Sequence, residues 1–207
     1  MIKISTSILS SNNRIECTQK LNETTNDYLH IDVMDGIFVP NTQFTIAEIN
    51  NLKNISKSKA DIHLMVEDPN LYIDKIENKN INNITFHLEV NQNIDNIINK
   101  IKSLNCKVGI AIKPKTDINR IVPYLDKIDT VLVMSVEPGF GGQKFIPESL
   151  NRLKKIKELK PTITVEVDGG VNNENIKEIK KYADIAVVGV YITNSNNYQE
   201  AINNLKN

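Results

Sequence analysis

The chain alternates between two patterns of apolar residues. Short runs rich in β-branched residues are followed by longer segments in which apolar residues recur at helical spacing. The short runs predict eight strands, at Ile2–Ser7, Tyr28–Asp32, Ala60–Leu64, Ile84–His87, Lys107–Ile112, Thr130–Met134, Thr162–Val167 and Ile185–Val188. The longer segments predict helices at Arg14–Thr25, Ile46–Ile55, Pro69–Asn78, Ile94–Leu104, Ile118–Leu125, Pro147–Leu159, Glu174–Lys181 and Tyr198–Leu205. Strands that are each followed by a helix predict an α/β fold, a single-domain (β/α)8 TIM barrel over residues 1–207.

The predicted strands are continuous apolar runs, as expected for a parallel sheet that is covered on both faces. An open, doubly wound sheet is the alternative, and it would need a glycine-rich turn after the first strand. The first turn here is Ser7-Ile8-Leu9-Ser10, which contains no glycine. Helix start signals at Asp68-Pro69, at Asp117 and at Asn172 or Asn173 support the alternation. The barrel is therefore favoured.

Composition narrows the classes of function. The 207 residues include 25 basic and 25 acidic side chains, and a net charge of zero argues against broad binding to nucleic acid or to an anionic membrane. The N-terminus lacks the apolar core of a signal peptide, and no apolar run reaches about 18 residues. Cys17 and Cys106 are too isolated for a disulfide framework, and we expect both to be small buried residues. A cytoplasmic protein is expected.

Candidate metal ligands stand at the carboxyl ends of predicted strands. His30 and Asp32 are two residues apart on one strand, so their side chains share a face. His63 lies at the end of the third strand and Asp168 follows the seventh, and in a barrel these strand ends meet at one face. Two neutral imidazoles and two carboxylates suit a divalent metal ion with open coordination positions, and the carboxylates could also transfer protons. The pattern indicates a metal-dependent enzyme that uses acid/base chemistry.

Neighbouring polar residues have plainer interpretations. A hydrogen-bonded pair inside the core is the alternative for His30 and Asp32. Asp35 precedes a glycine and is expected in a turn beyond the end of the strand. His87 is expected to be a structural residue or a partner of a ligand, paired with Glu89, and it is left out of the ligand set.

Glycines cluster in three predicted loops. Gly139–Gly142 follows the sixth strand, Gly169-Gly170 the seventh and Gly189 the eighth. Glycine-rich loops let backbone amides converge on an anion, and barrels often bind phosphate near the loops after strands 7 and 8. A flexible loop would explain Gly139–Gly142 by itself, but three neighbouring loops favour a phosphate group. The expected ligand is a phosphorylated small molecule.

Methionines occur at the same ends of the strands. Apart from Met1, the chain has Met34, Met65 and Met134, which fall at or just after the second, third and sixth predicted strands. Thioether side chains there could form a soft apolar wall around a reactive intermediate. Ordinary packing is the alternative interpretation.

Together these residues resemble those of the ribulose-phosphate 3-epimerase family. The similarity runs along nearly the whole chain, and the ordered set of motifs is more specific than any one motif. The motifs are Ser7-Ile8-Leu9-Ser10, His30 to Gly36, Phe38-Val39-Pro40-Asn41, His63 to Val66, Thr85 to Glu89, Pro138 to Gln143 and Asp168 to Val171. The resemblance implies a ribulose-phosphate binding barrel that interconverts D-ribulose 5-phosphate and D-xylulose 5-phosphate in the pentose phosphate pathway.

The resemblance also implies roles for single residues. One divalent metal ion (zinc, iron(II), manganese or cobalt) would be bound by His30, Asp32, His63 and Asp168. Asp32 and Asp168 would remove a proton from one face of carbon 3 and return it on the other, through an enediolate that the metal ion stabilises. Substrate contacts are implied for Ser7, His63, Met34, Met65, Met134, Asp168 and, at the phosphate, Gly139, Phe140, Gly141, Gly142, Gly169, Gly170, Gly189 and Val190. A homo-oligomer is implied as well.

The chain departs from the family pattern at several positions. Thr6 stands where proline is usual, Thr45 lies near a usual glycine, and Val190 replaces the serine that usually follows Gly189. Loss of that hydroxyl should weaken phosphate binding, although the backbone N–H of Val190 can still donate. Only 8 glycines are present, so asparagine is expected to take over some left-handed helix ends.

Two other functions stay as alternatives. An epimerase of the same fold could act on another ketose phosphate such as D-allulose 6-phosphate, and turnover of the two ketoses would separate these cases. A sugar-phosphate binding protein would bind its ligand without exchanging the carbon 3 proton with solvent. The full ligand set favours an enzyme, and the intact segments Glu137–Gly142 and Asp168–Val171 favour the ribulose type.

Overall fold

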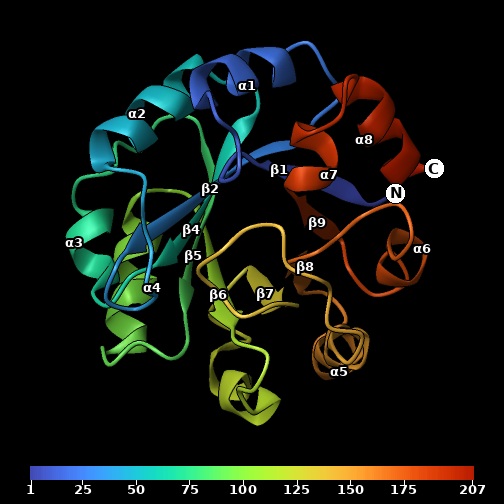
Figure 1. Cartoon of the computed structure of the whole chain (residues 1–207). Coiled ribbons are helices and arrows are strands. Elements are labelled where there is room, and N and C mark those ends of the chain that lie inside the picture. Colours follow the sequence, from blue (N-terminus) through green and yellow to red (C-terminus); the bar gives the residue numbers. More distant parts are fainter.

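A closed barrel of eight parallel strands lies at the centre of the computed structural model, which describes residues 1–207 (Figure 1). Neighbouring strands pair in chain order, and β1 pairs with both β2 and β9, which closes the barrel. The parallel strands are β1 (Lys3–Ser7), β2 (Tyr28–Asp35), β4 (Lys59–Met65), β5 (Ile81–His87), β6 (Lys107–Ile112), β7 (Thr130–Met134), β8 (Thr164–Asp168) and β9 (Ile185–Val188). The predicted (β/α)8 barrel is confirmed.

Helices connect the strands and surround the barrel (Figure 1). They are α1 (Arg14–Leu21), α2 (Ile46–Ile55), α3 (Pro69–Ile73), α4 (Ile94–Ser103), η1 (Ile118–Tyr124), α5 (Ser149–Leu159), α6 (Ile176–Ile179), α7 (Val190–Thr193) and α8 (Tyr198–Lys206). Their inner faces are apolar, as in α4, where Ile97, Ile98 and Ile101 are buried. These faces and the strands share one cluster of 48 buried apolar residues. None of the helices combines the length and apolar character needed to cross a membrane.

Several elements differ from the predicted ones, and α1 and α3 end before the predicted Thr25 and Asn78. The fifth predicted helix is a 3-10 helix, η1, which contains Pro123 and therefore lacks one backbone donor. The second strand runs on to Asp35, because the short antiparallel strand β3 (Thr42–Gln43) pairs with its end. Asp35 then makes the expected turn, with its carboxylate accepting from the backbone N–H groups of Ile37 and Phe38. The short helix α7 was not predicted.

Side-chain caps fix several helix starts. Asp68 and Asp117 cap α3 and η1, as predicted. The seventh predicted helix is much shorter than expected and spans only Ile176–Ile179. Its start is delayed because Asn172 accepts from the backbone N–H groups of Glu174 and Asn175 in a turn, so Asn172 does not cap the helix itself.

Several unusual polar residues are satisfied locally. Thr6 donates a buried hydrogen bond of 2.7 Å to Asn26, and Thr45 caps α2. Asn80 and Asn105 adopt left-handed conformations, with φ of 57° and 55°, just before β5 and β6. Asn105 directly follows the C-cap of α4, so the expectation that asparagine takes over a left-handed helix end is confirmed there, whereas Asn80 lies in a bend. Of the two cysteines, Cys17 is buried and Cys106 is only partly so.

Candidate active site

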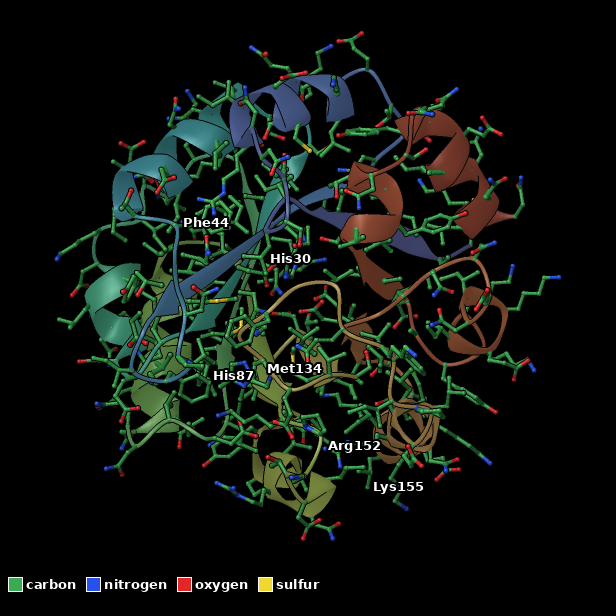
Figure 2. The ribbon with its side chains drawn as sticks, in the orientation of Figure 1. His30, Phe44, His87, Met134, Arg152 and Lys155 are labelled. Carbon is green, nitrogen blue, oxygen red and sulfur yellow. The ribbon has the colours of Figure 1, made fainter.

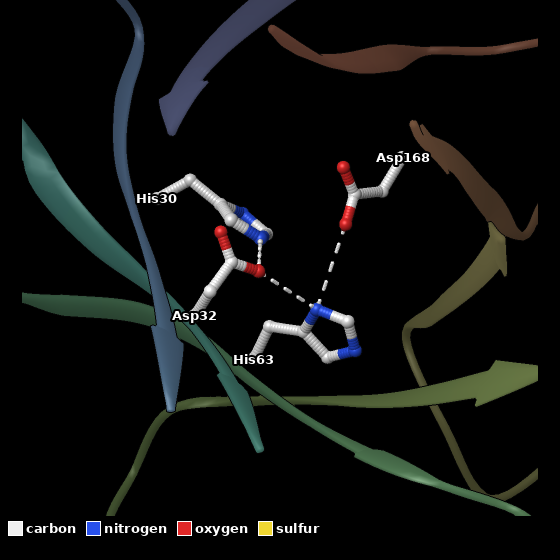
Figure 3. Close-up of side chains that lie close together, drawn as sticks. All are labelled: His30, Asp32, His63 and Asp168. Carbon is white, nitrogen blue, oxygen red and sulfur yellow. Dashed lines mark hydrogen bonds and ion pairs between the residues drawn. The ribbon is translucent and has the colours of Figure 1, made fainter. Parts of the chain in front are cut away.

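The register between β2 and β4 brings site residues together. His30 lies opposite Asp61, and Asp32 lies opposite His63. Residues two apart on a strand point to the same face, so all four side chains enter the barrel interior. Asp168, the last residue of β8, reaches the same place (Figure 3). The structure thus gathers the four predicted metal ligands from three strands.

The four side chains form a compact cluster. Oδ1 of Asp32 lies 3.2 Å from Nε2 of His30 and 3.2 Å from Nδ1 of His63, and Oδ2 of Asp168 lies 3.7 Å from that Nδ1 (Figure 3). All four ligand atoms are within 4.8 Å of one another. Ligand atoms about 2.0–2.2 Å from one tetrahedral ion would be roughly 3.3–3.6 Å apart, so the cluster fits a divalent metal ion. The contact between His30 and Asp32 is therefore one part of a larger arrangement.

Electrostatics displace the pKa values of the two aspartates in opposite directions. Burial acts to raise the pKa of Asp32, but His30 and His63 outweigh it and hold that pKa well below its usual range. Burial and the negative charge of Asp32 raise the pKa of Asp168 to about 6. With no cation in the cluster, Asp168 therefore holds a proton more tightly than Asp32 does.

A buried carboxylate that we did not single out from the sequence supports His30. Oδ2 of Asp61 lies 2.9 Å from Nδ1 of His30 and also accepts a hydrogen bond of 2.8 Å from Ser5. Burial opposes a charge on His30, but the carboxylates of Asp32 and Asp61 raise its pKa. The fully buried Glu166 lies in the same group, and burial together with the charge of Asp61 raises its pKa well above the usual value. The available signal was spacing, because Asp61 precedes His63 by two residues on one strand.

The third histidine lies just behind this cluster. His87 is fully buried, and its ring nitrogens lie 2.9 Å from Nε2 of His63 and 3.1 Å from Oε2 of Glu89. Burial lowers the pKa of His87 to about 4, against the opposing effect of Glu89. His87, labelled in Figure 2, is the last residue of β5. The predicted pairing of His87 with Glu89 is present.

A cavity of about 730 Å³ opens beside the cluster. Both aspartates line it, together with nearly all of the predicted substrate-binding residues: Ser7, Met34, Met65, Met134, Gly139, Phe140, Gly141, Gly142, Gly169, Gly170, Gly189 and Val190. His63 is the exception, because its side chain is fully buried. Polar residues that the sequence did not point to also line the cavity, among them Ser10, Lys144, Asn172 and Asn175.

The loops at the open end of this cavity depend on glycine. Gly139, Gly142, Gly169 and Gly170 all have positive φ angles. A Cβ atom on Gly170 would lie 2.3 Å from the backbone nitrogen of Phe145, so two loops touch there through their backbones. The arrangement brings main chain, beside the polar side chains named above, to a ligand.

The matching sequences decide the family. Residues 3–193 match the ribulose-phosphate 3 epimerase family. The chain belongs to this family. Ribulose-phosphate 3-epimerase from Buchnera aphidicola (subspecies Baizongia pistaciae, strain Bp) is 40% identical, with 98% of this chain and 93% of the relative covered. The Methanocaldococcus jannaschii enzyme of the same name is 37% identical, with 100% and 90% covered. The chain is thus an enzyme, an isomerase of the ribulose-phosphate 3-epimerase family.

Solved structures with the same fold have much lower sequence identity. KGPDC from Streptococcus mutans superposes with a TM-score of 0.77 at 15% identity, with 100% of this chain and 96% of that chain covered. The 3-hexulose-6-phosphate synthase from Salmonella typhimurium gives a TM-score of 0.73 at 15% identity, with 99% and 96% covered. These similarities support the barrel fold alone.

Proposed function

We propose that this ribulose-phosphate 3-epimerase family member interconverts D-ribulose 5-phosphate and D-xylulose 5-phosphate by proton transfer at carbon 3. The observation that carries the proposal is the pair Asp32 and Asp168, which line one cavity and belong to one cluster of two histidines and two aspartates. Inversion needs one carboxylate that accepts a proton and one carboxyl group that donates one. The pair meets this requirement.

The reaction has two proton transfers. The ionised aspartate takes the proton from carbon 3, and the electron pair of that C–H bond moves towards the carbonyl at carbon 2, which gives an enediolate. The protonated aspartate then delivers its proton to the opposite face of carbon 3. Each carboxyl group ends in the protonation state in which the other began, so the reverse reaction uses the same two residues with exchanged roles.

A divalent metal ion (zinc, iron(II), manganese or cobalt) would be held by His30, Asp32, His63 and Asp168. Two imidazoles and two carboxylates within 4.8 Å of one another suit such an ion. When bound, the ion would supply positive charge that stabilises the enediolate oxygens. The two buried histidines would also keep both aspartates oriented towards the cavity.

Other cavity residues would bind and shield the sugar phosphate. Ser7 donates a hydrogen bond of 2.6 Å to Oδ2 of Asp32, which orients that carboxylate beside the substrate. Met34, Met65 and Met134 would give the reacting carbon an apolar wall. The glycine loops and the first backbone amides of α7, beginning at Val190, would bind the phosphate. His63 would act through Asp32 and Asp168, because it does not line the cavity.

The proposal includes the setting of the reaction. The expected partner is a small sugar phosphate, and the expected setting is the pentose phosphate pathway in the cytoplasm. A homo-oligomer is also expected, and sedimentation of the purified protein tests that prediction.

The experiment follows the carbon 3 proton of D-ribulose 5-phosphate in deuterated water, with protein before and after chelation. We expect D-xylulose 5-phosphate labelled with deuterium at carbon 3, loss of activity on chelation, and recovery with a divalent ion. Turnover of D-allulose 6-phosphate in place of the ribulose substrate would move the assignment to the other epimerase. Binding without exchange, in the metal-loaded protein, would contradict an enzymatic role at this site.

A further inference from the structure

His30 and His63 face the other ligands of the cluster with different ring nitrogens. His30 faces Asp32 with Nε2, whereas His63 faces Asp32 and Asp168 with Nδ1. A neutral imidazole carries one proton, so a nitrogen that binds a cation requires the proton on the other nitrogen. His30 must then be protonated at Nδ1 and His63 at Nε2. Something has to select a different tautomer for each ring.

The selection at His30 is direct. Nδ1 of His30 lies 2.9 Å from Oδ2 of Asp61, and a carboxylate can only accept. The selection at His63 is not direct, because Nε2 of His63 meets Nε2 of His87 at 2.9 Å. Either ring nitrogen could donate in that contact, so the contact does not set its own direction.

We infer that Glu89 and His87 form a directional hydrogen-bond relay that places the proton of His63 on Nε2 and leaves Nδ1 free for the metal ion. This inference rests on the proposed metal site. Oε2 of Glu89 lies 3.1 Å from Nδ1 of His87, so Nδ1 of His87 carries the proton. Nε2 of neutral His87 is then a bare acceptor, and only a proton on Nε2 of His63 satisfies the contact.

The direction of the relay is fixed at Glu89 by a backbone N–H group, which can only donate. Oε1 of Glu89 accepts from the backbone N–H of Lys113 at 2.9 Å and from the hydroxyl of Thr116. A hydroxyl can turn and accept, but a backbone N–H only donates. Arg152 donates to the carbonyl oxygens of both Lys113 and Thr116, which holds this loop in place.

The relay is enclosed on its other sides. The side chain of His87 has no exposed surface and that of Glu89 is 14% exposed. The ring of Phe38 lies 4.8 Å from that of His87, between centroids, and Nζ of Lys113 lies 3.8 Å from the Phe38 centroid. Little water can therefore replace a missing partner, so the direction of each hydrogen bond is set by its neighbour. Glu89 and His87 are positioning residues, because neither lines the cavity.

Glu89→Gln should reverse the relay without changing its shape. The amide oxygen must face the N–H of Lys113, so the amide NH2 group faces Nδ1 of His87, which must now accept. His87 would then carry its proton on Nε2 and donate to Nε2 of His63. The proton of His63 would move to Nδ1, the nitrogen needed by the metal ion.

Thr116→Val is the matched control. It removes the other donor to Oε1 of Glu89, but it keeps both the carboxylate and the N–H of Lys113. The relay should keep its wild-type direction in this variant. A general disturbance of the loop would affect Thr116→Val and Glu89→Gln alike, whereas reversal is expected in Glu89→Gln only.

The test is long-range 1H–15N NMR of the ring nitrogens in zinc-loaded protein, joined to a zinc titration of the metal-free protein. Without a cation, the carboxylates of Asp32 and Asp168 would themselves accept from Nδ1 of His63 and mask the effect of the relay. With 3 histidines in the chain, each ring can be assigned by substitution. We expect a proton on Nδ1 of His87 and on Nε2 of His63 in the wild type and in Thr116→Val. In Glu89→Gln we expect the proton of His87 on Nε2 and zinc binding about 10–100-fold weaker.

Two results would overturn the relay. One is a wild-type protein in which His87 is protonated at Nε2, a measurement that needs no variant and survives misfolding of Glu89→Gln. The other is a folded Glu89→Gln protein with unchanged tautomers. A proton on Nδ1 of His87 in a wild-type protein that does not bind zinc would instead contradict the proposed metal site, so the two failures can be told apart.

Discussion

The two ends of the cavity differ in structure: one is a cluster of ionisable side chains and the other is a set of glycine-containing loops. At the buried end, the cluster of His30, Asp32, His63 and Asp168 consists of side chains, and partners such as Asp61 and His87 lie behind it. The open end is formed by loops that bring backbone close to the cavity through glycines with positive φ angles, and Phe140 there is 57% exposed. Chemistry at the buried end depends on residue identity, and binding at the open end depends on backbone shape.

This difference sets the size of the effects to expect. Charges at the buried end interact with little screening, so the loss of one group changes the ionisation or orientation of its neighbours. At the open end, water can replace a missing contact, so single hydrogen bonds contribute little to the net free energy of binding. Substitutions should therefore change the rate at the buried end and the affinity or stability at the open end.

The largest effect is expected for the aspartates. Asp32→Asn and Asp168→Asn should each lower kcat by about 10²–10⁴-fold, because each removes one proton-transfer group. The fold should persist, which far-UV circular dichroism can check. Asp129→Asn, at the amino end of the barrel, is the control and should keep normal turnover, since one amide oxygen can still accept from Val108. Near-normal turnover in either active-site variant would rule out a two-carboxylate mechanism.

The next largest effect is expected on metal affinity, for Asp61, which contacts the ligand His30 but does not line the cavity. Asp61→Asn should weaken zinc binding about 10–100-fold, because an amide supports Nδ1–H of His30 less strongly than a carboxylate does. Ser5→Ala removes one hydrogen bond to the same carboxylate and should have a smaller effect. Calorimetric titration of metal-free protein measures both. Equal affinities in Asp61→Asn and the wild type would show that this carboxylate does not support the ligand.

The sequence predicted the buried end better than its supporting residues. The spacing of His30 and Asp32 places both on one strand face, and β-branched runs mark the strand ends. The partnership of Asp61 with His30 depends on the register between β2 and β4, which the sequence of either strand does not contain. The direction of the hydrogen bond between His63 and His87 depends on the Lys113 backbone, far along the chain.

Shorter elements were predicted less well for local reasons. The apolar spacing of η1 would also suit an α-helix. Pro123 within it lacks the backbone N–H that an α-helix uses, and the segment is a 3-10 helix. The turn at Asn172 uses a residue type that also caps helices, so the start of α6 was placed too early. Strand and helix alternation survived these errors, because the barrel depends on buried runs much more than on helix length.

At the open end, Gly170→Ala tests whether backbone shape is the requirement. Gly170 has a φ of 66°, and an added Cβ would meet the backbone nitrogen of Phe145 at 2.3 Å. We expect a loss of about 1–3 kcal/mol in the free energy of unfolding, measured with urea, together with a raised KM. Gly142→Ala is the matched control, because its φ is also positive, at 74°, but the nearest atom to an added Cβ is 3.7 Å away. Equal losses in both variants would argue against a special role for the Gly170 backbone.

The smallest effect is a gain. Val190→Ser would supply a hydroxyl group at the first residue of α7, beside the loop that contains Gly142. One added hydrogen bond to a phosphate should lower KM by about 3–10-fold and leave kcat unchanged, because the group lies away from carbon 3. Val190→Ala removes the same methyl groups without adding a hydroxyl, so it separates the hydrogen bond from the loss of bulk. A lower KM in both variants would mean that Val190 obstructs the phosphate, and a changed kcat in Val190→Ser would mean that the open end also affects the chemistry.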